Sequence, residues 1–599
     1  MERFIIAAGG TGAMCARAFI YMAAAGCANN DDRYHILLMD KDRDSDAVTA
    51  CEDLLTNYNV MRMQMGLKPG TVTFPEIKVH KWNFTDEIVD EYVTRTGYAA
   101  GTLDSLTLKK LLNPAGNAQM AQILSTMYTQ EELNIDLAKG FYGHPNIGAP
   151  VFSYVQDRFL ATSVTKSDGT VQNNTFMTDL INELTAGKAY VYLMGSLFGG
   201  TGATVIPNVV LALRTLHDSA GNPVGETNLV LGGTVVMPYF KLPICPADST
   251  EKLASVAPAD SKFAGQTRDA LSYYHESGLL NNMMNLLLLG TTNLDVTSEL
   301  YARGGVQNQH FHIVNLLAAS AANRFFKDQL GAMAQAVNVP ATQAIAPLGE
   351  LLVWKADNTN AAVYNTLSAA ELDLSNEFQK LNEFLRFSVV VRYYMRLQFD
   401  VPLDDMRGFP EIRRTCKQMK RADGSSLDPK TITKNEIDDF YKKPVENAGI
   451  ICEGFIQFLY DVALSGYDWS GYHNKNKVPT AVRNGKQYYD YSVTTTVVPT
   501  AAADFGSRWV DLANLTDLKD LLEATNPLEI AEAKSLNGIS SFAMLDNGRT
   551  GVKETKYPNS IANVYKQTLE ALALEGPFWI KKRDDVWFCE IYDELRKRV

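Results

Sequence analysis

Two groups of glycines have the residue types and the spacing to bind phosphate. The first, Gly9-Gly10-Thr11-Gly12, follows the apolar run Phe4 to Ala8 and precedes a helical stretch from about Ala13 to Ala25. Glycines at such a turn let the backbone approach an anion closely, and the N-terminus of the helix adds partial positive charge. The turn predicts a phosphate-binding loop, although a tight strand-to-helix connection without a ligand would have the same sequence.

The second group, Gly199-Gly200-Thr201-Gly202, stands between the apolar run Tyr190 to Met194 and a helix ending near Leu216. The first turn alone is compatible with a dinucleotide-binding fold, because Asp40 stands where a ribose-binding carboxylate belongs, although Cys15 replaces the third glycine. A dinucleotide site has one such turn, whereas this chain has two, about 190 residues apart. The pair therefore favours a phosphate site built from both turns.

The elements that must position these turns are short, continuously apolar runs alternating with helical stretches. Ile36 to Met39, Leu229 to Met237 and Asn285 to Leu289 continue the series of expected strands. Runs without polar alternation are typical of strands buried on both faces of a parallel sheet. The fold class is therefore predicted as α/β, a parallel sheet flanked by helices.

Beyond the sheet, residues 308–337 have helical spacing and are expected to form a long central helix. The predicted domains are a nucleotide-binding domain over 1–307, this helix, and an α+β domain over 338–599. Within the last, we expect a strand at 351–354, a helix at 371–397 and β structure at 488–498, and residues 421–444 are polar enough for an exposed excursion.

The second turn resembles the signature loop of the tubulin/FtsZ superfamily, which reads G-G-G-T-G-[ST]-G and follows Ser-Leu in eukaryotic tubulins. Here Ser196-Leu197 precede the loop and Gly199 to Gly202 keep its core, while Phe198 replaces the first glycine and Thr204 stands in place of the last. The resemblance covers roughly residues 1 to 340, and its nearest match is the divergent bacterial tubulin-like group. It implies a GTPase-type domain followed by the central helix and a C-terminal domain.

Three further segments follow the order of that family. Ala8 to Ala13 resembles the first loop of FtsZ, with Met14 in place of a nucleotide-contacting asparagine, and Asp40 and Asp42 fall in the second loop, near metal and phosphates. Residues 143–148 resemble the γ-phosphate loop, which would place Gly143, Asn146 and Gly148 at the nucleotide. Residues 114–117, Pro-Ala-Gly-Asn, are a competing candidate for that loop.

For the base, the resemblance implies an asparagine or aspartate of the central helix. Asn323 is our choice, because an amide offers both a donor and an acceptor to guanine. Asn308 and Asn315 are alternatives, and a helix-packing role for Asn323 is equally open. In the family, acids in a loop after this helix position the attacking water of a neighbouring subunit. Pro340 and Gln343 stand in their place, so we expect hydrolysis to be slow or absent unless Asp328 or Glu350 replaces them.

The resemblance implies GTP or GDP as ligand, with Mg²⁺ near the acids, and head-to-tail self-assembly into filaments with nucleotide at the subunit seam. An NAD-binding enzyme and a non-polymerising regulatory protein remain alternatives. Basic residues at 581–583 and 596–598 would suit an adaptor protein, as in plasmid-segregating relatives, or are solvated surface charges.

The composition argues against several classes of protein. The formal net charge of −12 argues against direct nucleic-acid binding, and 46% hydrophobic residues argue against wholesale disorder. The seven cysteines lack paired spacing and the eight histidines are scattered, so neither a disulfide framework nor a metal site is predicted. No signal peptide or membrane span is visible, and a cytoplasmic protein is expected.

Overall fold

The protein was analysed as a computed structural model of the whole chain. It describes residues 1–40, 46–64, 74–98, 105–137, 141, 145–240, 260–276, 285–290, 310–327, 352–357, 360–366, 377, 380–381, 384, 388, 421, 423–428, 430–438, 443–468, 479–483 and 486–489.

The centre of the fold is an eight-stranded sheet in the order β10-β9-β8-β7-β6-β1-β2-β3. The six strands from β8 to β3 are mutually parallel, and β9 and β10 extend the sheet antiparallel at one end. Their bounds are β1 Glu2–Ala8, β2 Arg33–Asp40, β3 Glu76–Asn83, β6 Ala189–Ser196, β7 Leu229–Val236, β8 Asn285–Gly290, β9 Leu352–Asp357 and β10 Asn360–Thr366. The predicted α/β class with a parallel sheet is confirmed.

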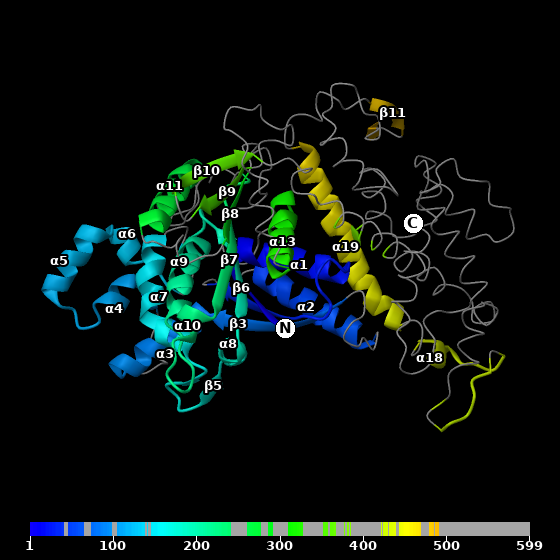
Figure 1. Cartoon of the computed structure of the whole chain (residues 1–599), viewed down its shortest axis with the longest axis horizontal. Helices are drawn as coiled ribbons and strands as arrows, with labels where there is room; N and C mark the ends of the chain where they lie inside the picture. The colour runs from blue at the N-terminus through cyan, green and yellow to red at the C-terminus, as the bar shows by residue number, and fades with distance from the viewer. Residues whose placement is uncertain are drawn as a thin grey trace.

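Helices cover both faces of the sheet (Figure 1). On the right in that view lie α1 (Gly9–Ala24), α2 (Asp46–Gln64) and α13 (Ile313–Phe326), with α19 (Lys443–Asp468) outside them. The opposite face is covered by α3 (Phe84–Thr96), α7 (Pro145–Leu160), α8 (Thr175–Ala186), α9 (Gly200–Arg214), α10 (Val224–Thr227) and α11 (Asp260–Glu276). The core is the two layers of apolar side chains between the sheet and these helices.

The expected strands are buried on both faces, as their continuous apolar sequences predict: every residue from Arg3 to Ala8 is buried. Strand β3 was not predicted, because its sequence Glu-Ile-Lys-Val-His-Lys-Trp-Asn mixes polar residues with apolar ones. It lies at the edge of the sheet, where one side of the strand has no neighbouring strand. Alternation is typical of such half-exposed strands.

The C-terminal predictions are confirmed only in part. Within the central-helix segment 308–337, α13 covers Ile313–Phe326, and residues 328–337 lie outside the described part. The strand expected at 351–354 is β9. Because β9 pairs with β8, the sheet continues past the predicted domain boundary into residues assigned to the C-terminal domain.

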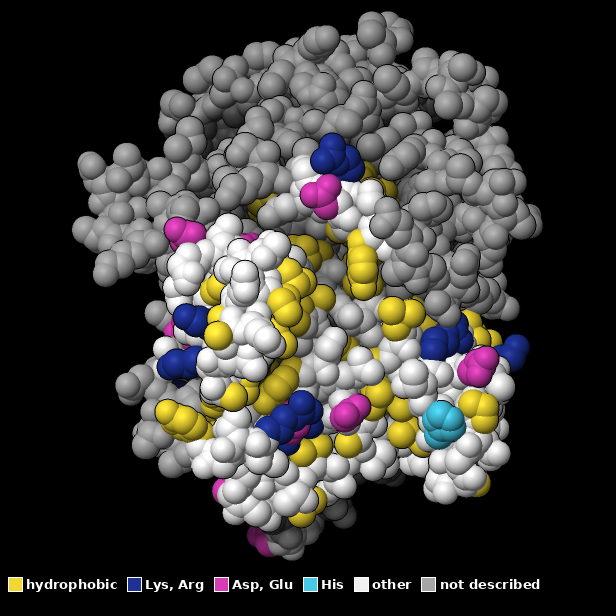
Figure 2. Space-filling model, turned by 90° about the vertical axis from the view of Figure 1, so that its left-hand side faces the viewer, with side chains coloured by type: hydrophobic (Ala, Val, Ile, Leu, Met, Phe, Trp, Pro, Cys, Tyr) yellow, Lys and Arg dark blue, Asp and Glu magenta, His cyan; other side chains and the backbone are white. Residues whose placement is uncertain are grey.

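Smaller elements surround this core. They are α4 (Leu108–Leu112), α5 (Ala118–Met127), α6 (Gln130–Leu133), the hairpin β4 (Ser163–Thr165) and β5 (Val171–Asn173), α18 (Lys434–Ile437), and the hairpin β11 (Pro479–Arg483) and β12 (Lys486–Tyr489). Figure 2 shows the face that lies on the left in Figure 1, where hydrophobic side chains reach the surface at several places. On α5 only Leu124 is buried, so this helix adds little to the core.

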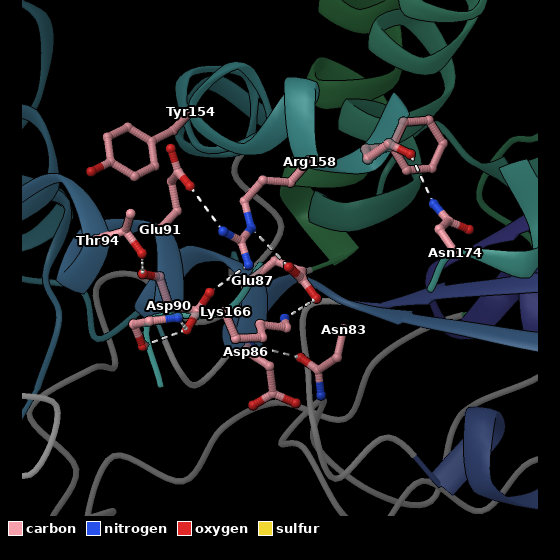
Figure 3. Close-up of polar contacts among 12 residues, drawn as sticks. Asn83, Asp86, Glu87, Asp90, Glu91, Thr94, Tyr154, Arg158, Lys166 and Asn174 are labelled. Atoms are coloured by element: carbon pink, nitrogen blue, oxygen red, sulfur yellow. Dashed lines mark hydrogen bonds and ion pairs between the residues drawn. The ribbon is translucent and has the colours of Figure 1, made fainter. Parts of the chain in front are cut away.

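A buried ionic cluster joins α3 to α7 (Figure 3). The guanidinium of Arg158 donates from Nε to Glu87 at 2.9 Å, from Nη1 to Glu91 at 3.0 Å, and from Nη2 to Asp90. Lys166 adds a second cation, 2.7 Å from Glu87. Both Arg158 and Glu87 have side chains only 7% exposed, so the charges compensate one another largely out of water.

None of the helices in the described part of the chain has the length and apolar character needed to cross a membrane.

Candidate functional site

The two glycine turns lie side by side at the centre of the sheet. From β1 the chain passes through α1 to β2 and then to β3 on one side, whereas from β6 it passes through α9 to β7 and then to β8 on the other. Strands β1 and β6 are parallel neighbours, so both turns leave the same edge of the sheet. In open α/β sheets this reversal of strand order is where ligands bind, beyond the carboxyl ends of the strands.

The first turn holds α1 tightly against the strands. Gly9 has φ +70°, in the left-handed region that favours glycine. At Gly12, a Cβ would lie 2.5 Å from the carbonyl oxygen of Met194 and 2.9 Å from the carbonyl carbon of Ala7. Both neighbours are backbone of the two central strands, so only a glycine fits here and the helix starts immediately above the sheet.

The second turn meets the first. A Cβ at Gly9 would lie 3.3 Å from Cβ of Thr201 and 3.4 Å from the backbone nitrogen of Gly202. The hydroxyl of Thr201 donates to Asp40 at the end of β2, over 3.1 Å. Residues from three strand ends therefore meet in one place, which we call the glycine cradle: Gly9 to Gly12, Gly199 to Gly202, and Asp40.

The helix starts in this cradle are unusual in lacking side-chain caps. Among the helices of ten residues or more whose N-cap the structure describes, α3, α5, α8 and α13 each have a cap side chain that accepts a backbone N–H. In α1 the N-cap is Ala8 and in α9 it is Gly199, and neither makes a side-chain cap. First-turn N–H groups without a capping acceptor are suited to bind an external anion.

A third predicted loop reaches the same place. Helix α7 starts at Pro145 and packs along α9, and a Cβ at Gly148 would lie 2.1 Å from the hydroxyl of Thr204. That hydroxyl donates to the carbonyl of Gly200 at 2.7 Å. Asn146 is exposed at the start of α7, and its amide donates to Glu132 at 3.1 Å. Residues 145–148, the described end of this predicted loop, thus lie beside the second glycine turn.

The competing loop has a different role. In residues 114–117, Asn117 caps α5 by accepting from the backbone N–H groups of Gln119 and Met120. Gly116 has φ +67°, and a Cβ there would meet no atom within 4 Å. These contacts account for the Gly-Asn sequence as a local turn between α4 and α5.

Phe198, which interrupts the glycine signature, packs in an aromatic cluster. Its ring centroid lies 4.8 Å from that of Phe263, 5.6 Å from Phe240 and 6.3 Å from Tyr239. The side chain is accommodated by this cluster and is itself buried. Met14, the other departure from the family pattern, is also buried, and its sulfur accepts from Arg17.

The N-terminus of α13 reaches α1 just behind the first turn. The amide of Asn315 is fully buried and lies 3.6 Å from the sulfur of Cys15. Burial raises the pKa of Tyr239, and hydrogen bonding of the side chains of Asn315 and Thr11 with its phenolic oxygen opposes that rise. Asn315 is thus linked to the cradle through Tyr239 and Thr11.

Asn323, our choice for base recognition, lies eight residues farther along the same helix, roughly 12 Å from Asn315 at 1.5 Å per residue. It is 1% exposed, and among the described residues neither its side-chain oxygen nor its nitrogen has a hydrogen-bond partner. Of the two asparagines, Asn315 is the one with a described side-chain contact to α1, at Cys15.

The remaining predicted site residues fall outside the described part of the chain. These are Asp42, Gly143, Asn308, the residues after the central helix from Asp328 to Glu350, and the basic groups at 581–583 and 596–598.

Comparison with known proteins adds no relative. No protein-family model matches the sequence, and neither a curated protein nor a solved structure shows significant similarity to the chain.

Proposed function

We propose that this protein binds GTP or GDP in the glycine cradle and assembles head to tail, in the manner of the tubulin/FtsZ superfamily. The observation that supports the proposal is the contact between the two glycine turns at the reversal of strand order, where α1 and α9 both begin without side-chain caps. Two helix N-termini that meet can each supply backbone N–H groups to a chain of phosphates.

The same arrangement favours a nucleoside di- or triphosphate over a dinucleotide. A dinucleotide-binding fold offers one glycine turn to a pyrophosphate, whereas here α9 adds a second helix start beside the first, and α7 begins next to α9. Asp40 is the acid that the described part of the cradle contains, and it would hold Mg²⁺, which prefers carboxylate oxygens and water. The ion would neutralise phosphate charge next to that carboxylate.

For base recognition the proposal has two candidates. Asn315 is linked to the first turn through Tyr239, and Asn323 has a buried amide without a partner among the described residues. An amide in either place can pair with guanine as donor and acceptor. Asn315 is the better placed, because Thr11 of the cradle hydrogen-bonds to the same tyrosine.

Assembly rests on the resemblance of the two loops to the superfamily. A head-to-tail contact is heterologous and propagates as a filament unless it closes into a ring. We propose that hydrolysis is slow or absent, because Pro340 and Gln343 replace the acids of the family loop. A nucleotide-binding regulatory protein that does not polymerise is the alternative if GTP binds without assembly.

The second candidate function, a dinucleotide-linked enzyme, is favoured by one observation. The strand order on the two sides of β1 and the carboxylate at the end of β2 are those of a dinucleotide-binding fold. In this chain, however, Asp40 accepts a hydrogen bond from Thr201 of the second turn.

The test is to identify the nucleotide released on denaturing the purified protein and to titrate GTP, GDP, ATP and NAD by calorimetry. Gly9→Ala should weaken guanine-nucleotide binding at least tenfold, and Gly116→Ala is the matched control. Both glycines have φ near +70°, so both variants carry a similar strain of roughly 1–2 kcal/mol, but only Gly9 lies in the cradle. A released dinucleotide, or equal nucleotide affinity in the two variants, would refute the proposal.

Assembly is tested separately by pelleting and negative-stain microscopy with and without GTP. Filaments that depend on GTP and on protein concentration are expected. Tight GTP binding without filaments at any protein concentration would support the nucleotide site and refute the proposed assembly into filaments.

A further inference from the structure

At the far end of the sheet from the cradle, three side chains with metal-binding atoms converge. Nδ1 of His35 lies 3.1 Å from Nε2 of His80 and 3.5 Å from Oδ2 of Asp179. The three ligand atoms all lie within 4.8 Å of one another. His35 is five residues before Asp40 on β2, about 16 Å away along the strand, so this cluster is separate from the nucleotide site.

The register of the sheet brings these residues together. His35 on β2 pairs with Lys78 on β3, so His80, two residues on, points to the same face of the sheet. Asp179 comes from α8, which packs over that face. His35 is fully buried, while His80 and Asp179 are half-buried, so an ion could enter from the exposed side.

The second ring nitrogen of each histidine has its own partner. Nε2 of His35 lies 2.7 Å from the carboxylate of Glu2, and Nδ1 of His80 lies 3.1 Å from the hydroxyl of Thr175. A carboxylate that accepts from Nε2 leaves Nδ1 of His35 unprotonated, with its lone pair directed at the cluster. Metal-binding histidines typically have such a partner, which fixes the tautomer and the ring orientation.

Burial keeps both rings neutral, which metal binding requires. Desolvation lowers the pKa of His35 against the opposing effects of Glu2 and Asp179. Desolvation and the neighbouring His35 lower the pKa of His80 to about 4.

We propose that His35, His80 and Asp179 bind one Zn²⁺ ion, with Glu2 and Thr175 as partners of the two imidazoles. Two ligands at 2.0–2.1 Å from a tetrahedral ion are separated by roughly 3.3 Å, close to the 3.1 Å and 3.5 Å that separate Nδ1 of His35 from the other two ligand atoms. Two imidazoles and one carboxylate are ligands that zinc accepts, and water would complete the fourth position. The ion would tie α8 to strand β2 and to the edge strand β3.

Lys78 is the one group of the cluster that opposes the ion. Its Nζ lies 3.4 Å from Oδ2 of Asp179, and the side chain is 41% exposed. A flexible, partly exposed lysine can turn into water when a cation occupies the carboxylate. The proposal therefore requires Lys78→Gln to bind zinc at least as tightly as the wild-type protein.

The experiment is zinc titration of the full-length, chelator-treated protein, with metal content measured after dialysis and melting followed with and without zinc. The wild type should retain one zinc per chain at the cluster and melt at a higher temperature with zinc. His80→Gln and Asp179→Asn should each weaken this site more than tenfold and abolish the thermal shift. His217→Gln, which alters an exposed histidine in a surface loop, is the matched control and should behave like the wild type.

The melting temperature of each variant without zinc shows whether it folds, so a loss of binding in a folded variant counts for the proposal. Co²⁺ in place of Zn²⁺ should give the intense visible absorption of a four-coordinate site, absent in Asp179→Asn. The proposal is overturned if the wild type retains no zinc at low micromolar concentration, if either ligand variant binds zinc as the wild type does, or if Lys78→Gln binds more weakly.

Discussion

Arg158 offers the sharpest test of how the charged layer between α3 and α7 is held. Replacing it with methionine, which keeps much of the aliphatic volume, would leave Glu87, Asp90 and Glu91 without their shared cation. Only Lys166 would remain near Glu87. Removing the shared partner of a buried ionic cluster costs roughly 3–5 kcal/mol, because the charges left behind lose a partner and are poorly hydrated.

The chain is too long for one unfolding transition to report on this site, so the measurement is local. Amide hydrogen exchange in α3 and α7, followed by mass spectrometry, gives the free energy of opening of those helices. A loss of 3–5 kcal/mol corresponds to exchange roughly 150- to 4500-fold faster in Arg158→Met at neutral pH. Peptides from α19, on the other side of the sheet, should be unchanged.

The pH dependence of exchange in α3 and α7 gives a second test of the cluster. Burial acts to raise the pKa of Asp90, but the hydrogen bonds from Ser167 and the charge of Arg158 outweigh it and hold the pKa below the ordinary value. A carboxylate with a lowered pKa stabilises the fold above its unfolded pKa of about 4, and that contribution is lost as the pH falls through the folded pKa. In Arg158→Met the carboxylate of Asp90 loses the cation that favours its charged form, so the defect should shrink between pH 7 and about pH 5.

Arg95→Met is the matched control. Arg95 also pairs with Glu91 but is 49% exposed, and an exposed pair of this kind is worth less than about 1 kcal/mol. If Arg158→Met and Arg95→Met accelerate exchange equally, or if the Arg158→Met defect is the same at pH 5 and pH 7, the buried cluster does not contribute as argued.

Three further predictions concern the cradle and its surroundings. Gly12→Ala should lower the stability of the fold by about 1–3 kcal/mol, because the added Cβ would press on the backbone of Ala7 and Met194. A melting temperature equal to that of the wild type would contradict this packing. Gly148→Ala should destabilise α7 by a similar amount, about 1–3 kcal/mol, because its Cβ would clash with the side chain of Thr204. Adding Thr204→Gly to the same chain should therefore recover part of that loss. A double-mutant cycle of thermal melts measures the coupling between the two substitutions. Cys15 and Cys51 are fully buried, and burial raises the pKa of each thiol to about 12. Peptide-resolved alkylation at pH 8 should therefore leave both thiols unmodified in the native protein and label them in urea. Fast labelling of the native protein would mean that α1 and α2 open readily.

Much of the central sheet could be predicted because its strands are nearly all apolar. Short, continuously apolar runs are typical of strands that are buried on both faces of a parallel sheet. Strand β3 could not, since Lys78, His80 and Lys81 break the apolar pattern and only its pairing with β2 shows the strand. The central helix was predicted from spacing, but which asparagine approaches the cradle depends on where α13 crosses α1. The family resemblance pointed to Asn323, whereas the packing of α13 against α1 placed Asn315 beside Cys15.

The sequence by itself determined that two glycine turns each join a buried strand to a helix, since local backbone geometry and helix polarity depend on neighbouring residues. Only the tertiary structure decided that the turns touch, because the parallel pairing of β1 with β6 brings residues about 190 positions apart to one edge. The same holds for His35, His80 and Asp179. Scattered in the sequence, they meet because sheet register and the packing of α8 act over distances that residue spacing does not encode.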